Sequence, residues 1–394
     1  MNSNNIKDLG YGFILGDSLD VNQYFSNIDH DLNWESNWGN NIITPELIRE
    51  IKSRGFRTIK VPITWEDHMK YSDDYKSVEC EKWWIDRCKE VVQYILDEDL
   101  YCIINIHHDA DWLYTMDENN KDLIIEKYKT LWKYIATEFK DFDKNKLFYE
   151  NMNETGWESN TFHNYNQLFG QMFIDIVRDI DGDSTRLLFI EGIYADVKTT
   201  YEEFWNVEDD NYVVAVHFYT PYEFTIPDSK FGKIYEERRI KNITTDEDGN
   251  LLPDIDIERI YRTYGDIYKF TKDKYGGTVI YNEYDHSIVE ERLSLINSIQ
   301  EKYNCKCAIT EFGINPKYRD KDHVYDWIKQ VTVFCENNNI PLLIWNNGNN
   351  HQCILRDEGM IDRDNVEMMK IVSFYNHIVF GDELPDEYKA EDCI

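Results

Sequence analysis

The chain has 394 residues, of which 42% are hydrophobic and 15% aromatic, and its 75 acidic residues exceed its 42 basic residues to give a formal charge of −33. This negative charge would repel phosphate backbones and anionic membrane surfaces, which excludes nucleic acids and lipid as expected partners and favours a neutral ligand. The aromatic excess suits ligands with flat apolar faces, such as sugar rings, beyond those rings that belong to the core.

Targeting signals are not found in the sequence. There is no run of about 18 apolar residues, so we expect no membrane span. The first residues lack a basic region followed by an apolar one, so we expect no secretory signal. The eight cysteines show no disulfide-framework spacing. As written, the chain is expected to be reduced and cytoplasmic, whereas a trimmed mature chain would be extracellular and would look the same. The sequence carries no signal for an oligomeric state.

The predicted elements alternate, in chain order, between a short apolar strand and a helix. The strands are predicted over 11–19, 57–63, 101–106, 147–152, 187–190, 212–218, 306–310 and 341–345. A first helix is predicted from Thr44–Pro45–Glu46, with Thr as N-cap and Pro at the first helical position, and further helices over 82–96, 123–139, 162–180, 288–302, 323–337 and 366–377. This alternation predicts a single α/β domain, a (β/α)8 TIM barrel. An open doubly wound sheet is disfavoured because no Gly-rich phosphate loop follows a strand.

One segment breaks this alternation. Residues 228–284 form too long a connection between the sixth and seventh strands to be ordinary, and we interpret them as an insertion on the active face, either a lid or a cleft wall. The barrel is predicted to occupy 1–380, and 381–394 form an acidic C-terminal tail.

Two apolar runs end on a glutamate that is placed for chemistry. Glu154 follows the run at 147–152, and Glu311 ends the run at 306–310. A strand that ends on Glu has a charged side chain where an apolar one would fill the core, so each residue is expected to face a cleft. Two carboxylates in one cleft are the equipment of a glycoside hydrolase, and a double-displacement enzyme needs them about 5–5.5 Å apart.

Four other predicted strands also end in polar or ring side chains, and strand ends are where reactive groups collect in such barrels. Six of the eight strand ends share this property; the quoted ends are Thr64–Trp65, His107–His108–Asp109, Asn153–Glu154, His217–Phe218–Tyr219, Glu311–Phe312 and Trp345–Asn346–Asn347.

These motifs, in this order, resemble those of glycoside hydrolase family 5, the cellulase family, and especially its endoglucanase and xyloglucanase members. They are Gly16–Asp17–Ser18–Leu19–Asp20, Trp38–Gly39–Asn40, the run from Gly55 to Trp65, Ile104–Asn105–Ile106–His107–His108, Asn153–Glu154, His217–Phe218–Tyr219–Thr220–Pro221, Thr310–Glu311–Phe312–Gly313 and Trp345–Asn346–Asn347–Gly348. The resemblance implies a (β/α)8 barrel, retaining hydrolysis and no cofactor. It assigns the acid/base role to Glu154 and the nucleophile role to Glu311.

On this assignment, the neighbouring residues have supporting roles. We expect Lys60 and Tyr219 to keep Glu311 ionised, and Asn153 to hydrogen-bond the sugar 2-hydroxyl. The remaining expectations are orientation of these groups by His107 and His217, a substrate contact by His108, stacking of a sugar on Trp345, and positions further along the cleft for Trp38 and Trp65.

Two departures from the family pattern leave alternatives open. Lys60 stands where the family has an arginine, and Thr155 stands where it usually has a proline. These departures motivate a second hypothesis, a non-catalytic carbohydrate-binding protein on a decayed barrel.

Other side chains suggest weaker alternatives. Zinc at His107–His108, with Asp109 and His217, is disfavoured because adjacent strand residues point to opposite faces. Glu150 and Glu191 are spare strand-end carboxylates, for which we expect surface or salt-bridge roles.

The leading interpretation is a retaining β-glycosidase of the cellulase type, an endo-β-1,4-glucanase that acts on a neutral β-1,4-glucan or oligosaccharide. A xyloglucanase and a β-mannanase of the same family are the alternative enzymes, and no metal or cofactor is expected.

Overall fold

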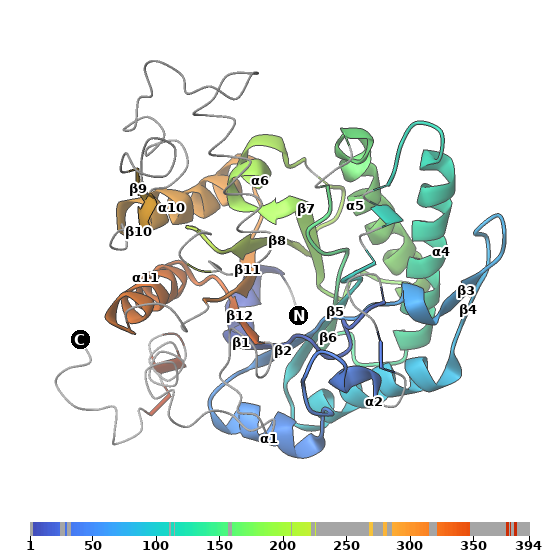
Figure 1. The fold of residues 1–394 in the computed structure, drawn as a ribbon, viewed down its shortest axis with the longest axis horizontal. Coiled ribbons are helices and arrows are strands. Elements are labelled where there is room, and N and C mark those ends of the chain that lie inside the picture. Colours follow the sequence, from blue (N-terminus) through green and yellow to red (C-terminus); the bar gives the residue numbers. More distant parts are fainter. Residues whose placement is uncertain are drawn as a thin grey trace.

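Eight parallel strands close into a barrel in the part of the chain that the structure, a computed structural model, describes (Figure 1). That part comprises residues 3–23, 28–29, 33–109, 112–113, 115–156, 160–205, 207–221, 225, 268–270, 279–281, 286–314, 321–346, 376–377, 379 and 382–383. The barrel strands are β1 (Tyr11–Leu15), β2 (Thr58–Val61), β5 (Tyr101–Asn105), β6 (Leu147–Glu150), β7 (Leu188–Asp196), β8 (Tyr212–Phe218), β11 (Cys307–Phe312) and β12 (Leu342–Asn346).

The order of the strands around the barrel is β1-β12-β11-β8-β7-β6-β5-β2. β1 closes the ring because it pairs in parallel with both β12 and β2. The strands are largely apolar along their length because parallel strands are covered on both faces. The predicted (β/α)8 barrel is therefore confirmed.

Helices cover the outside of the barrel (Figure 1). They are α1 (Pro45–Ser53), α2 (Lys82–Asp97), α4 (Lys121–Phe139), α5 (Asn160–Asp181), α6 (Val197–Glu203), α10 (His286–Tyr303) and α11 (Lys321–Asn338). α1 begins as its sequence predicts, with Pro45 in the first turn and the Thr44 hydroxyl accepting the backbone N–H of Leu47. Among the described residues, none of the helices combines the length and apolar character that a bilayer crossing needs.

Shorter elements decorate the barrel. The 3-10 helices η1 (Ser3–Leu9), η2 (Trp34–Ser36) and η3 (Glu66–His68) flank β1 and β2. A hairpin of β3 (Met69–Tyr71) and β4 (Val78–Cys80), which we did not predict, lies in the connection from β2 to α2. β9 (Tyr268–Phe270) and β10 (Val279–Tyr281) form a second antiparallel pair.

The core has two parts, as a filled barrel requires. Side chains from alternate positions of the strands fill the barrel interior, among them Ile14, Ile103 and Phe148, and η1 adds Ile6 and Leu9 to this cluster. A larger cluster packs the outer face of the strands against the helices. α2 shows the pattern, because its buried side chains Trp84, Ile85, Cys88, Val91, Val92 and Ile95 recur every three or four residues.

Two strands run at least two residues further than predicted. β7 continues to Asp196 through a register shift after Glu191, where Tyr194 and Ala195 have φ values of 62° and 50°. β11 continues to Phe312 through a register shift between Ile309 and Glu311. Such bulges re-aim side chains, and both occur at glutamates discussed below.

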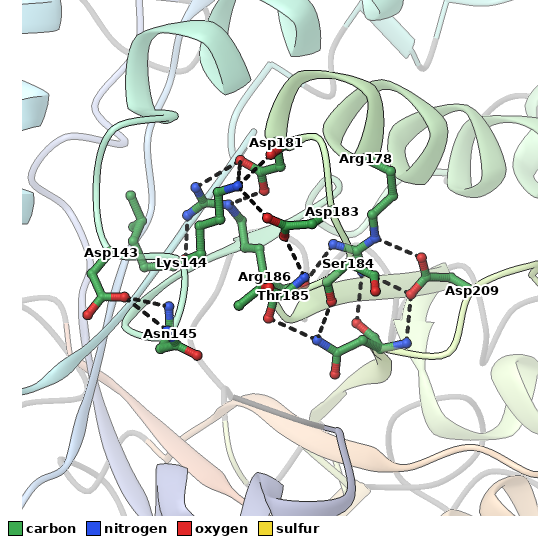
Figure 2. Close-up of polar contacts among 12 residues, drawn as sticks. Asp143, Lys144, Asn145, Arg178, Asp181, Asp183, Ser184, Thr185, Arg186 and Asp209 are labelled. Atoms are coloured by element: carbon green, nitrogen blue, oxygen red, sulfur yellow. Dashed lines mark hydrogen bonds and ion pairs between the residues drawn. The ribbon is translucent and has the colours of Figure 1, made fainter.

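A network of charges fastens the N-terminal ends of β6 and β7 (Figure 2). The fully buried Arg186 pairs with Asp181 at 2.8 Å and donates to the carbonyl of Leu147 at 2.6 Å. Arg178 binds both carboxylate oxygens of Asp209, at 2.7 and 2.9 Å, and the carbonyl of Arg186. Because reactive groups in these barrels lie at the other ends of the strands, we assign this network to stability.

Several expectations fall largely outside the described residues. They are the insertion at 228–284, of which the structure describes β9 and β10, the helix at 366–377, and the tail at 381–394. Within the tail, the described Asp382 forms an ion pair with Arg57 at 2.7 Å.

Candidate active site

Glu154 and Glu311 come together at the C-terminal ends of β6 and β11. One carboxylate oxygen of each residue, together with a ring nitrogen of His217, lies in a group whose members are within 4.8 Å of one another. The Glu311 side chain is 9% exposed, whereas that of Glu154 is 31% exposed. This separation is shorter than the about 6.5–9.5 Å between the carboxyl groups of inverting glycosidases and fits the retaining arrangement of about 5–5.5 Å.

His217 joins this pair from the end of β8. Its Nδ1 lies 2.7 Å from Oε1 of Glu154 and 3.8 Å from Oε2 of Glu311, and its Nε2 lies 3.1 Å from Oε1 of Glu191. A neutral imidazole has a single N–H, whereas carboxylate oxygens face both nitrogens here, so ionised carboxylates on both sides favour the doubly protonated ring. Burial by itself would lower the pKa of His217, but Glu311 and Glu191, with the hydrogen bonds to Glu154 and Glu191, raise it well above its usual value.

Glu311 is held by a hydroxyl and by nearby positive charge. The Tyr219 hydroxyl donates to Oε1 of Glu311 at 2.7 Å. Burial raises the pKa of Glu311, and Glu154 adds to the rise, while His217, Lys60 and Tyr219 act to lower it. The register shift in β11 at this residue lets Glu311 pair beside His217 of β8.

Lys60 lies in the barrel interior as the first member of a buried chain of polar contacts. Its Nζ lies 2.5 Å from Oε2 of Glu150, and both side chains are 0% exposed. Burial would lower the pKa of Lys60, but the carboxylates of Glu150, Glu191 and Glu311 together raise it. Lys60 therefore supplies positive charge that favours an ionised Glu311, although its direct ion-pair partner is Glu150.

Asn105 carries this chain on to His107. Its amide nitrogen contacts Oε2 of Glu150 at 3.1 Å and Nδ1 of His107 at 3.2 Å. Because an amide N–H donates, Nδ1 of His107 accepts and the ring proton is on Nε2. Burial, with the nearby His108, Lys60 and His217, lowers the pKa of His107 well below its usual value, so this ring is neutral.

Glu191 fixes both the backbone of Glu154 and the ring of His217. Its Oε2 accepts the backbone N–H of Glu154 at 2.7 Å, and its own N–H is held by Asn151 at 2.9 Å. Glu154 has a φ of 45°, which is a strained conformation for a residue with a side chain. Burial raises the pKa of Glu191 to about 7, against the lowering influence of His217.

The tryptophans divide between cleft and core. Trp345, which is partly buried, lies parallel to His107 at a ring distance of 5.6 Å, and Trp38 contacts His108 at 5.4 Å. Trp65 is 0% exposed, and its indole N–H donates to the carbonyl of Asn105. The prediction that Trp65 lines the cleft is wrong, because the chain turns after β2 and buries the ring against Phe139 of α4.

Two further residues complete the polar part of the site. Asn153 is 7% exposed, and within the described residues its Oδ1 has no hydrogen-bond partner, which fits an atom that receives a ligand hydroxyl. His108 is held by a hydrogen bond of 2.7 Å from Nδ1 to the carbonyl of Asp20.

His107 and His108 do not point to opposite faces of a strand, so the geometric reason for disfavouring zinc at these two histidines is wrong. β5 ends at Asn105, so His107 and His108 do not alternate as strand residues, and their ring centres lie 4.5 Å apart. One ligand atom from each, with one from Asp20, fits within 4.8 Å. The Nδ1 atoms are nevertheless engaged by Asn105 and by the Asp20 carbonyl.

Sequence reasoning underestimated Glu150 and Glu191. Both are 0% exposed, so the surface role is wrong for both and the salt-bridge role is confirmed. Asn105 was missed as well. Its signal was available, because all three are polar residues inside apolar strands, where burial requires a partner.

Comparisons with known proteins agree with this geometry. Residues 21–351 match the family model described as cellulase (glycosyl hydrolase family 5). Endoglucanase A of Ruminococcus albus is 30% identical over 285 residues, covering 68% of this chain and 75% of that protein. Endoglucanase A of Clostridium longisporum is 30% identical over 239 residues, covering 57% of this chain but only 44% of that protein.

A solved structure shares the fold. A xyloglucan-specific endo-β-1,4-glucanase from a metagenomic library, determined with cellotriose, superposes with a TM-score of 0.69 at 23% identity, covering 94% of this chain and 97% of that one.

Proposed function

Because this chain belongs to glycosyl hydrolase family 5, the cellulase family, we propose that it is a retaining endo-β-1,4-glucanase in which Glu311 is the nucleophile and Glu154 the acid/base. The observation that carries the proposal is the approach of the two carboxylates to within 4.8 Å, with His217 between them. The named relatives support the activity, since they are endoglucanases.

In the first step, an oxygen of Glu311 attacks the anomeric carbon while Glu154 gives its proton to the departing glycosidic oxygen. The bond to the leaving sugar breaks, and a glycosyl ester on Glu311 forms. Oε1 of Glu154 already accepts the N–H of His217, so the transferred proton belongs on Oε2. In the second step, Glu154 takes a proton from water, which attacks the same carbon and releases Glu311.

The surrounding groups make this exchange possible. Tyr219 and the cationic His217 and Lys60 favour an ionised Glu311 before attack. Asn153 is proposed to accept a hydrogen bond from the sugar 2-hydroxyl, a contact that strengthens in the transition state. Trp345 is proposed to stack on a sugar face. Its position depends on Gly16, where a Cβ would lie 2.5 Å from the ring.

A neutral β-1,4-glucan fits the acidic character of the chain. Xyloglucan is the second candidate substrate, because one curated relative, 30% identical over 202 residues, is a xyloglucan-specific endo-β-1,4-glucanase of Bacteroides ovatus. Mannan stays an untested prediction and is a useful comparison substrate.

The test compares reducing-sugar release from hydroxyethylcellulose, xyloglucan and mannan by wild type, Glu311→Gln and Glu154→Gln. We expect hydrolysis of a β-1,4-glucan backbone with the first-formed reducing end in the β configuration, seen by proton NMR. Loss of general acid catalysis in Glu154→Gln should cost about 10²–10⁴-fold. Equal hydrolysis by wild type and Glu311→Gln would refute the assignment of Glu311 as nucleophile, whereas no hydrolysis of any of the three polymers by wild type would support the non-catalytic carbohydrate-binding hypothesis.

A further inference from the structure

A cavity of about 350 Å³ lies where the N-terminus of α2 meets η2, away from the residues of the proposed reaction. Three tryptophans line it, Trp34, Trp83 and Trp84, together with Asp86, Arg87 and Glu90. Its volume is at the lower end of the range for ligand pockets, about 300–1,000 Å³. A ligand here would therefore be a short segment of a larger molecule, or a small one.

Trp83 is the unusual member of this group. Its side chain is 51% exposed and, among the described residues, it is the sole aromatic ring in the set of exposed large hydrophobic side chains. The ring does not lie free on the surface, because its Nε1 donates to Oε2 of Glu81 at 2.9 Å. Its edge contacts Trp84 at 5.5 Å and His68 at 5.1 Å. The structure thus holds a half-exposed indole in a fixed orientation.

The rings behind Trp83 make this platform rigid. His68, 2% exposed, stacks on the fully buried Trp84 at 3.9 Å, and Trp34 meets the edge of His68 at 4.5 Å. Trp34 is itself tied to the carbonyl of Val21 through its indole N–H. A ligand that binds such a preformed surface loses little side-chain entropy of the protein.

The charged groups of the cavity select a neutral polar ligand. Arg87 is already occupied, since Glu35 binds it at 2.5 and 3.0 Å and Glu90 at 2.5 Å. Asp86 and Glu90 are 56% and 51% exposed. Asp86 is paired with Lys82 at 2.6 Å and Glu90 with Arg87, and each carboxylate still has lone pairs that can accept a hydroxyl hydrogen bond at the cavity mouth. An anion would meet three carboxylates, and the two nearby cations, Arg87 and Lys82, are already paired with them. A sugar instead places its C–H face on the indole and donates its hydroxyls to the carboxylates.

The cavity lies on the same end of the barrel as the reacting pair. η2 follows β1, and the N-terminus of α2 follows β2, so both belong to connections that leave the C-terminal ends of strands. Trp38, four positions after Trp34, contacts His108 of the candidate active site.

We propose that the cavity formed by Trp34, Trp83 and Trp84 is an auxiliary saccharide-binding site, which holds a segment of a neutral β-glucan chain outside the reacting pair. The choice of β-glucan depends on the proposed function. The site raises the time that a polymer spends on the enzyme and contributes little to a substrate too short to reach it.

The experiment is affinity electrophoresis in native gels that contain hydroxyethylcellulose, with Glu311→Gln as the parent so that the polymer stays intact. We expect Trp83→Ala to raise the apparent dissociation constant by about tenfold, as the loss of a central tryptophan does in other binding sites. Leu123→Ala is the matched control, because Leu123 is 48% exposed on α4 but does not line the cavity, so its removal should not change retention. Retention of the negatively charged carboxymethylcellulose should not depend on Trp83.

Unchanged retention of Trp83→Ala on hydroxyethylcellulose would overturn the proposal. The proposal would also be overturned if Trp83→Ala lost retention equally on dextran, a neutral α-glucan. If Trp83→Ala unfolds at a lower temperature than its parent, Asp86→Ala gives the second test, with an expected loss of about threefold. The proposed function is judged separately, from hydrolysis of an aryl β-cellobioside by wild type. If wild type does not hydrolyse the substrate but retention depends on Trp83, the proposed enzyme activity is refuted and the saccharide-binding site is supported. If wild type hydrolyses the substrate but retention does not depend on Trp83, only the saccharide-binding site is refuted.

Discussion

Replacement of Glu191 by glutamine tests whether a side chain that does not touch the substrate controls the reacting pair. Glutamine keeps the size of Glu191 but has a single acceptor oxygen. Two donors face the Glu191 carboxylate, the backbone N–H of Glu154 at 2.7 Å and Nε2 of His217 at 3.1 Å, and each needs its own acceptor oxygen. In Glu191→Gln one of these donors faces an amide N–H instead. The strained backbone of Glu154 or the ring of His217 then loses its support.

The size of the effect follows from the hydrogen bonds involved. A hydrogen bond to a charged group contributes about 1.5–3 kcal/mol. Since about 1.4 kcal/mol corresponds to a tenfold change in rate, kcat for an aryl β-cellobioside should fall by about 10- to 150-fold. KM should change little, because Glu191 is fully buried behind His217.

The pH dependence gives the more specific readout. Glu191 is one of the charges that raise the pKa of His217, so its neutralisation lowers that pKa. Because the protonated ring binds Glu154, the alkaline limb of the kcat/KM profile should move to lower pH. The control is Glu336→Gln, since Glu336 is also a buried carboxylate, with a pKa raised by burial to about 7, but lies on α11 outside the site. A profile of Glu191→Gln that matches those of wild type and Glu336→Gln, with kcat unchanged, would refute the positioning role.

Three further substitutions test other parts of the site. Lys60→Ala leaves Glu150 buried without its ion-pair partner and should lower the free energy of unfolding by about 3–5 kcal/mol, measured in urea; a loss below about 1 kcal/mol would contradict the buried pair. Trp65→Phe should destabilise the fold by about 1–3 kcal/mol through lost packing, without changing KM, and a raised KM at unchanged stability would return Trp65 to the cleft. Gly16→Ala should push the ring of Trp345 from its place and raise KM for cello-oligosaccharides about tenfold, whereas an unchanged KM would show that the ring does not bind sugar.

The barrel and the two central glutamates could be predicted because they depend on local patterns. Apolar runs separated by helices specify the alternation, and Glu154 and Glu311 interrupt such runs at their ends. Glu191 looked the same in sequence, yet it is turned into the interior next to a register shift in β7, which depends on pairing with β8.

The prediction that Trp65 lies along the cleft was wrong for a related reason. A ring directly after a strand can point into the cleft or pack beneath a helix. The Trp65 backbone N–H donates to the Asp109 carboxylate, and in this conformation the Trp65 ring packs against Phe139 of α4. The β3–β4 hairpin was missed because three-residue strands carry too little periodicity to be seen.

The arginine network under β6 and β7 has a practical consequence for protein engineering. Arg178 and Arg186 form ion pairs at the N-terminal ends of the barrel strands, while the reaction is proposed to occur at their C-terminal ends. Thermal stability could therefore be improved by adding ion pairs to this network, for example between α5 and the segment that precedes β8. Substrate preference could be redesigned independently in the rim loops, so two goals that usually compete could be pursued in the same molecule.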